Sequence, residues 1–381
     1  MSTLALPGWR TLQRRVVMPR LHRPDWWLLI AVAGLVGLGI VLVFNASYFY
    51  ALDRSGDPYL YFRKHLLSIV MGGTLAVAVS KIRIELLERS AHVLLLLGII
   101  SLALVLIPHV GLVRGGARRW IGIGGFSIQP SEWVKIALAI YLAQSIARRG
   151  EKMASFTMGI LPHLIVVGVC MALIVVQPDF GTAAILGLLL MAMLFAGGAR
   201  VLHLLALAVP GILLATFTIM HAGYRMRRIM AFLDPWKYSK DIAFQLVQSL
   251  IAFGSGGVTG VGLGQSKQKL FFLPEAHTDF IFALVGEELG LFGVLLVLAL
   301  FGLLGMRGFR VALRHPDRFG SLLAFGLTLV LLLEAVVNVG VVLGLLPTKG
   351  LALPFLSSGG SAMMVALVQV GLLAALSRQT G

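Results

Sequence analysis

Apolar stretches long enough to cross a membrane recur along the whole chain, and they restrict it to one kind of fold. Of its 381 residues, 58% are hydrophobic and 13% are charged, which is roughly half the charged fraction of a soluble domain. The pattern predicts an all-α, polytopic membrane protein with about ten transmembrane helices and a large loop between spans seven and eight. The predicted spans are 26–49, 64–81, 88–109, 131–148, 158–177, 180–198, 201–221, 279–306, 319–346 and 358–377.

Basic residues divide unevenly between the two sides of this bundle. The side that holds both termini carries 17 Lys and Arg residues, whereas the short loops of the other side carry seven. Short loops rich in Lys and Arg stay in the cytoplasm, so both termini are predicted to be cytoplasmic. The predicted parts are a basic cytoplasmic arm (1–24), a transmembrane domain (25–378) with a large extracytoplasmic loop (222–278), and a cytoplasmic tail (379–381).

The loops on the predicted outer side also contain many cations, although Lys and Arg are usually enriched in cytoplasmic loops. An external anionic ligand explains them, and phosphate or pyrophosphate is the usual ligand of Arg and Lys. Contact with anionic lipid headgroups is the alternative. Nucleic acid is not expected as a partner, because the charge is dispersed over loops and no binding module is present. The loop cations are Arg114, Arg118, Arg119, Arg225, Arg227, Arg228, Lys237, Lys240, Lys267, Lys269 and Lys349.

The large loop has internal order. Segment 241–253 is apolar except for four polar residues at helical spacing, which predicts a helix in the plane of the membrane interface with one polar face. Those four residues are Asp241, Gln245, Gln248 and Ser249. Segment 254–264 contains six glycines. No strand precedes it, so it predicts a close approach of the backbone to a ligand rather than a nucleotide-binding loop.

Several ionisable residues lie inside the predicted spans. Glu132 and Lys135 are three residues apart on one helix face and can pair. Glu287, Glu288 and Glu334 lie deeper, where an unpaired charge is expensive. Each is expected either to join helices through an ion pair or hydrogen bond, or to serve a function.

The polar segment 273–279 (LPEAHTD) places a carboxylate, Asp279, at the mouth of the eighth span. A charge at that position needs either a function or a partner. A simple helix N-cap is the structural alternative. Metal chemistry has little support in the sequence, because the lone cysteine, Cys170, lies inside a span and no His, Asp and Glu set has metal-ligand spacing.

Four long segments resemble, in order, the signatures of one family. They are 116–137 (GARRWIGIGGFSIQPSEWVKIA), 177–183 (QPDFGTA), 254–290 (GSGGVTGVGLGQSKQKLFFLPEAHTDFIFALVGEELG) and 338–362 (NVGVVLGLLPTKGLALPFLSSGGSA). On these segments the chain is similar to the SEDS family of cell-wall polymerases, the FtsW/RodA/SpoVE group, over about residues 25–378. The LPTKG segment looks more like FtsW, the division member, than RodA, the elongation member. Ser358 departs from the family, which usually has tyrosine there.

The resemblance implies a peptidoglycan glycosyltransferase that polymerises lipid II, an undecaprenyl-pyrophosphate-linked disaccharide, at the outer face of the membrane during cell division. It implies that Asp279 is catalytic, as a general base, as a group that orients the attacking hydroxyl, or as the ligand of a divalent cation. No other cofactor is implied. The candidate substrate-binding residues are Arg118, Arg119, Glu132, Lys135, His277, Thr278, Lys349, Ser357 and Ser358.

Two other functions fit the same resemblance. One is a lipid II flippase, for which the deep carboxylates would line a path. The other is a non-catalytic scaffold that recruits a transpeptidase. The resemblance further implies the bacterial cytoplasmic membrane at the division septum, with a class B penicillin-binding protein and other divisome membrane proteins as partners. Gly302, Gly305 and Gly320, in spans eight and nine, are small enough to admit a partner helix.

Overall fold

The structure is a computed structural model that describes residues 23–380 except 115, 124–125, 222 and 275. Most of the predicted basic arm (1–24) and the final residue of the predicted tail lie outside the described residues. Within the described part, a helix coincides with each of the ten predicted spans. These helices are α1 (Trp26–Ser55), α2 (Leu60–Val79), α3 (Ile84–Leu106), α4 (Pro130–Arg149), α5 (Leu161–Val176), α6 (Phe180–Ala196), α7 (Val201–Met220), α10 (Ile281–Arg314), α11 (Arg318–Val342) and α12 (Gly360–Ser377).

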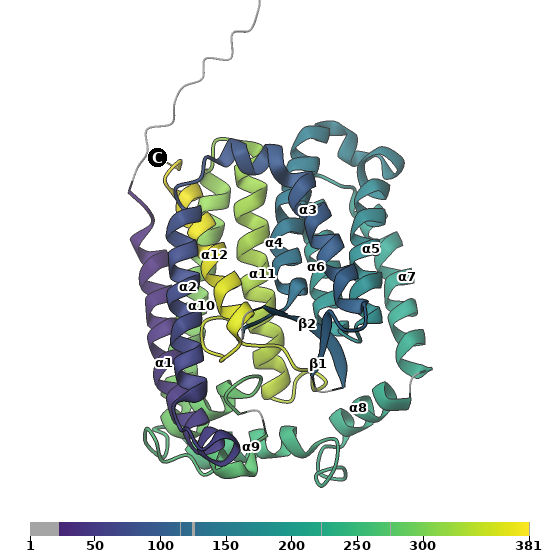
Figure 1. The fold of residues 1–381 in the computed structure, drawn as a ribbon. Helices are drawn as coiled ribbons and strands as arrows, with labels where there is room; N and C mark the ends of the chain where they lie inside the picture. Colours follow the sequence, from purple (N-terminus) through teal and green to yellow (C-terminus); the bar gives the residue numbers. More distant parts are fainter. Residues whose placement is uncertain (1–22, 115, 124–125, 222, 275, 381) are drawn as a thin grey trace, which may run out of the picture.

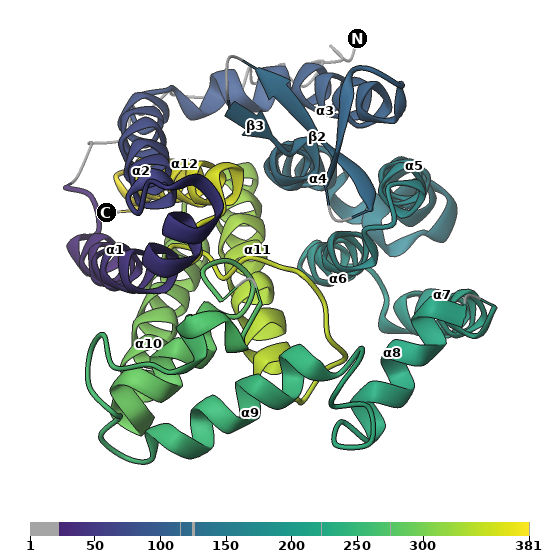
Figure 2. The same ribbon diagram turned by 60° about the horizontal axis from the view of Figure 1, so that its bottom comes forward.

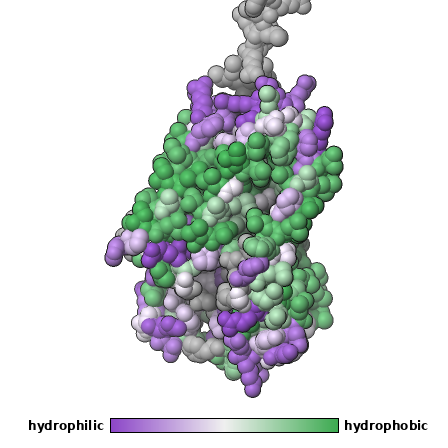
Figure 3. Space-filling view, turned by 90° about the vertical axis from the view of Figure 1, so that its right-hand side faces the viewer, coloured by the Kyte–Doolittle hydropathy of each residue, from purple (hydrophilic) through white to green (hydrophobic). Residues whose placement is uncertain are grey.

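The helices stand side by side as one bundle (Figure 1). By length and composition, seven helices of the described chain are long and apolar enough to cross a membrane, and α6 and the first part of α7 are shorter apolar helices. Figure 3 shows a band of apolar side chains across one face, between two polar ends. The predicted fold class is therefore confirmed: the protein is an α-helical, polytopic membrane protein.

Two helices, α4 and α12, are buried along almost their whole length. Every described residue of α4 from Pro130 to Ile146 is buried except Trp133, and α12 is buried throughout from Met363 to Ser377. The other helices surround them, which explains how α4 carries charged residues that lipid would reject. Hydropathy alone underrates α4 for the same reason.

A small sheet replaces the loop predicted at 110–130. Its strands are β1 (Gly111–Arg114), β2 (Ala117–Ile123) and β3 (Phe126–Ile128), in the order β1-β2-β3 with both pairs antiparallel. Figures 1 and 2 show it at the end of the bundle opposite the C-terminus, beside α3 and α4. The sheet orders the cationic segment that the sequence left as an irregular loop.

The large loop contains two helices, α8 (Gly223–Leu233) and α9 (Phe244–Gly256). Figures 1 and 2 show α9 running across the end of the bundle instead of along it, as the interfacial prediction requires. The predicted polar face is wrong at Ser249, which is fully buried and donates its hydroxyl hydrogen to the carbonyl of Val342 in α11, at 2.7 Å. A serine can satisfy a buried acceptor in this way, so polarity did not mark the solvent side.

The glycine-rich segment docks against a break in α10. Gly290 has φ +63°, which interrupts the helix. The carbonyls of Glu287 and Glu288 accept from Val261 (2.9 Å) and Gly262 (3.1 Å) of the glycine-rich segment. In the other direction, the N–H groups of Leu291 and Phe292 donate to Gly257 (3.0 Å) and Val258 (3.3 Å). Close backbone approach was predicted correctly, but its partner is α10 itself instead of a ligand.

This contact leaves no room for a side chain at residue 290. A β-carbon there would lie 2.6 Å from the carbonyl oxygen of Val258, and an L residue also resists the positive φ. Gly290→Ala should therefore destabilise the folded protein by more than about 1 kcal/mol and lower the temperature of thermal unfolding. Gly302→Ala, in the same helix with nothing within 4 Å of the added carbon, is the control and should unfold like the wild type. Equal unfolding temperatures for the two variants would contradict the docking.

Candidate active site

Two loops meet at the end of the bundle opposite the C-terminal end of α12. The segment that precedes α10 is joined to the segment that precedes α12 by one backbone hydrogen bond and one side-chain hydrogen bond. Ser358 donates its N–H to the carbonyl of His277 (3.0 Å), and the Ser357 hydroxyl donates to the carbonyl of Thr278 (2.6 Å). The Ser357 oxygen also accepts from the N–H of Leu353 (2.8 Å). Four of the predicted substrate-binding residues thus come together, and Ser357 holds the loops in place.

A buried amide extends this connection to the predicted catalytic residue. Asn338, in α11, donates one side-chain N–H to the carbonyl of Asp279 (2.8 Å) and another to the carbonyl of Leu351 (2.6 Å). Asn338 is 1% exposed. Asn338 was not predicted as a site residue, although a polar amide inside an apolar span is a signal for one.

The carboxylate of Asp279 lies against the LPTKG segment. Its Oδ2 atom would be 2.6 Å from a β-carbon at residue 350, so glycine is needed there for the carboxylate to fit. The N-cap position of α10 is occupied by Phe280 and not by Asp279. The half-buried Asp279 side chain thus contacts Gly350, the residue that follows Lys349 in the chain.

Lys349 belongs to a polar cluster with the turn between α5 and α6. Its ammonium lies 4.0 Å from Oδ1 of Asp179. Asp179 is held in place as the N-cap of α6, where it accepts from the N–H (3.3 Å) and the hydroxyl (2.8 Å) of Thr182. Arg119 binds the same turn: its guanidinium donates to the carbonyls of Gln177 (2.9 Å) and Pro178 (2.5 Å).

A third cation joins from the large loop. Arg228, in α8, donates to the carbonyl of Thr348 at 3.0 Å, one residue before Lys349. Burial lowers the pKa of Lys349 from 10.5 to about 8, Asp179 partly opposes that shift, and the positive charges of Arg119 and Arg228 lower it further. Arg119, Arg228 and Lys349 are called the cation cluster below. Arg228 was predicted only as one of the many external cations and Asp179 was not predicted as a site residue, because both come from segments more than a hundred residues away from Lys349.

Arg118 does not make these contacts. It follows Ala117 in β2, next to Arg119, and successive strand residues point to opposite faces. Its guanidinium donates to the carbonyl of Leu106 at the end of α3 (3.3 Å), away from the turn that Arg119 grips. The structure thus separates two arginines that the sequence placed together.

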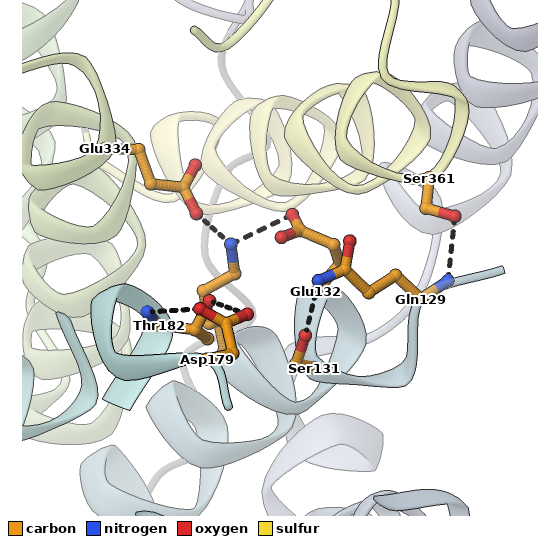
Figure 4. A network of polar contacts seen from close by, with 8 residues as sticks. Gln129, Ser131, Glu132, Asp179, Thr182, Glu334 and Ser361 are labelled. Carbon is orange, nitrogen blue, oxygen red and sulfur yellow. Dashed lines mark hydrogen bonds and ion pairs between the residues drawn. The ribbon is translucent and has the colours of Figure 1, made fainter. Parts of the chain in front are cut away.

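The predicted pair of Glu132 and Lys135 forms inside the bundle (Figure 4). The Lys135 ammonium donates to Glu132 at 2.9 Å and to Glu334 of α11, and its side chain is 1% exposed. Gln129, just before α4, donates its N–H to the hydroxyl of Ser361 in α12 at 3.0 Å. These contacts join α4, α11 and α12. The substrate-binding roles of Glu132 and Lys135 stay predictions.

The two deep glutamates of α10 also have protein partners. Glu287 accepts from the hydroxyl of Ser266 and from the N–H groups of Lys267 (3.0 Å) and Gln268 (3.4 Å). Glu288 accepts from the Asn45 amide of α1 at 3.3 Å, and its other oxygen lies 3.9 Å from the Lys269 ammonium. Both therefore anchor the large loop to the bundle, which confirms the structural reading of these residues.

The described residues around Asp279 do not form a metal-binding cluster. Among the residues that the structure describes, no group of three or more His, Cys, Asp or Glu side chains is arranged to hold a metal ion. A divalent cation held by Asp279 alone with substrate oxygens stays a prediction.

Comparisons with known proteins agree with this architecture. The family model for FtsW, RodA and SpoVE, described as a cell cycle protein, matches residues 26–381. A Geobacter metallireducens protein named "Probable peptidoglycan glycosyltransferase FtsW" is 42% identical over 362 residues, covering 95% of this chain and 96% of that protein. Stage V sporulation protein E of Bacillus subtilis is 39% identical, covering 93% and 97% of the two chains.

Two solved structures are similar over nearly the whole chain. One belongs to a peptidoglycan synthase complex described for its coordination of polymerization and crosslinking, with a TM-score of 0.77 and 28% identity over 93% of this chain and 98% of that chain. The other is the rod shape determining protein RodA of Thermus thermophilus, with a TM-score of 0.70 and 27% identity over 94% and 97%. The chain belongs to the FtsW/RodA/SpoVE family, the SEDS membrane proteins.

The Lys135 network should act mainly through stability. Lys135→Met would leave Glu132 and Glu334 buried without their cation, and breaking such a pair costs about 3–5 kcal/mol. We expect a strongly lowered unfolding temperature and folding yield. The control is Arg63→Met, which removes a largely exposed ion pair with Asp57 and should cost less than about 1 kcal/mol. If Lys135→Met unfolds like the control, the network does not hold the helices together.

Proposed function

We propose that the protein is a peptidoglycan glycosyltransferase that polymerises lipid II into glycan strands for septal cell-wall synthesis. The observation that carries this proposal is the contact of the Asp279 carboxylate with Gly350, the residue that follows Lys349 of the cation cluster. The names of the close relatives support it. The charge asymmetry supports cytoplasmic termini, and with that orientation this end of the bundle faces outward.

The chemistry fits the two kinds of charged group. A hydroxyl of the acceptor sugar attacks C1 of the donor sugar, and the bond between C1 and the lipid pyrophosphate breaks. Asp279 accepts the hydroxyl proton or orients the hydroxyl. Arg119, Lys349 and Arg228 stabilise the negative charge that grows on the departing pyrophosphate. The loop connection around Asn338 and Ser357 holds base and cations in one geometry.

Transport of lipid II gains no support from the deep carboxylates. Glu287, Glu288 and Glu334 all have protein partners that tie helices or the large loop together. A flippase would need such groups to receive a charged headgroup on its way across the membrane. The structure gives them a scaffolding task that does not depend on transport.

A transpeptidase, a class B penicillin-binding protein, is the proposed partner at the septum. The similar chain comes from a complex described for polymerization and crosslinking, and uncrosslinked strands need a crosslinking enzyme nearby. Of the three glycines predicted to admit a partner, Gly305 and Gly320 already face Leu332 and His315 of this chain. Only Gly302 of these three has open space around it, so the predicted contact surface narrows to that part of α10.

Loss of the Asp279 carboxylate should abolish catalysis without unfolding the protein. Asp279→Asn keeps the shape of the side chain and the carbonyl contact with Asn338, so the unfolding temperature should stay near that of the wild type. General-base loss costs about 10²–10⁴-fold in rate. The measurement is glycan-strand formation by purified protein from lipid II, resolved by gel. A variant that keeps more than about a tenth of the wild-type rate is incompatible with this role.

The cation cluster predicts an unusual alkaline limit. With a folded pKa of about 8, Lys349 is charged below that pH, so polymerisation at low lipid II should fall as pH rises through about 8. Lys349→Arg stays charged and should move this fall to higher pH, whereas Lys237→Arg, on an exposed side chain of the same large loop, should not.

Unfolding would not explain this loss. The folded pKa of Lys349 lies below its ordinary value of 10.5, so the unfolded chain binds more protons, and this group raises the unfolding free energy as pH rises from about 8 to 10.5. Activity and stability should thus change in opposite directions. Identical alkaline limbs in the wild type and Lys349→Arg would remove Lys349 from pyrophosphate binding.

A further inference from the structure

A recess at the opposite end of the bundle from Asp279 gathers basic side chains. It lies where α1 begins and where α10 and α12 end, and it encloses about 320 Å³. That volume is at the lower end of the range for small-molecule sites, about 300–1,000 Å³. Arg23, Arg307, Arg310 and Arg314 line it together with a single carboxylate, Asp25. Four guanidinium groups therefore share one negative charge.

Asp25 fixes the frame of the recess. It accepts from Nε of Arg307 at 3.0 and 2.8 Å, and Nη2 of Arg307 lies 2.6 Å from Oδ2. Asp25 also caps α1 by accepting from the N–H of Leu28 (3.2 Å) and donates its own N–H to the Ser377 hydroxyl of α12 (3.1 Å). The carboxylate thus pairs with one arginine of α10 and caps α1, while the backbone N–H of Asp25 binds α12.

The remaining arginines are not neutralised. Arg310 and Arg314 follow Arg307 by three and seven residues, on one face of α10. They and Arg23 are exposed, and none of the three has an ion-pair partner within the described part of the chain. Cations suit a helix C-terminus and the cytoplasmic side, but neither rule requires them to line a common recess.

Two aromatic side chains indicate where the recess lies relative to the membrane. Trp26 and Trp27 also line it, and they are 59% and 58% exposed. Exposed tryptophans at the end of a transmembrane helix lie at the level of the lipid headgroups. The recess therefore opens to the headgroup layer, where a phosphate attached to acyl chains is the abundant anion.

We propose that this recess binds the phosphodiester headgroup of an anionic phospholipid. Arg23, Arg310 and Arg314 donate to the phosphate oxygens, for which the guanidinium fork is well shaped. Arg307, held by Asp25, contributes a fixed positive charge behind them. The two tryptophans contact the glycerol and the upper acyl chains. The site lies far from the catalytic loops and does not depend on the proposed activity.

Native mass spectrometry of the purified full chain tests the site. The protein is incubated in mild detergent with phosphatidylglycerol or with zwitterionic phosphatidylcholine, and only the former should stay bound. Each basic residue near a membrane strengthens anionic lipid binding roughly fivefold. The double variant Arg310→Gln with Arg314→Gln should therefore bind phosphatidylglycerol on the order of twentyfold more weakly.

The matched control removes the same charge elsewhere. Arg83→Gln with Arg89→Gln changes two exposed arginines beside and within α3, at the same end of the bundle (Figure 1), and should keep the lipid. Should the first double variant fold poorly, Arg314→Gln alone should still show the fivefold loss. Equal losses in the two double variants, or equal binding of the two lipids, would overturn the proposal. Full displacement of the lipid by millimolar glycerol phosphate would do the same, because it would mark a site for a soluble phosphate.

Discussion

The structure depends on one constraint: inside a bundle surrounded by lipid, every polar group that leaves water must find a partner in the protein. Lys135 meets it with Glu132 and Glu334, and so joins α4 to α11. The break in α10 at Gly290 meets it by exchanging backbone hydrogen bonds with the glycine-rich segment. Polar residues in this chain therefore do not interrupt the fold. They specify which helix lies beside which. Apolar side chains specify this only weakly, because they pack against lipid tails about as well as against another helix.

The same constraint creates the candidate active site. Loops that lie outside the bundle must be held by groups from inside it, and Asn338 does so by binding the carbonyls of both Asp279 and Leu351. The carboxylate then faces Gly350, next to a lysine whose pKa is lowered to about 8 by burial and neighbouring arginines. Accumulated positive charge of this kind is costly without an anion. A bound pyrophosphate would remove the repulsion between these cations. The repulsion in the empty site therefore favours substrate binding.

Local and non-local features explain what the sequence could predict. Spans are local, since length and hydropathy are properties of one segment, and all ten were found as helices. The sheet at 111–128 needs pairing between short strands and was missed. Adjacent Arg118 and Arg119 were grouped, but the alternation of a strand sends them to different partners. Asp179 and Arg228 reach Lys349 only through tertiary folding, which no spacing rule contains.

A double-mutant cycle between Arg119 and Lys349 tests most directly whether the cation cluster is one site. The measured quantity is kcat/KM for lipid II polymerisation in the wild type, Arg119→Ala, Lys349→Ala and the double variant. If both cations act on one pyrophosphate beside the Asp179 turn, the two losses should be coupled by about 0.5–3 kcal/mol. Losses that add to within about 0.3 kcal/mol would mean that the two residues act independently, and would contradict the account.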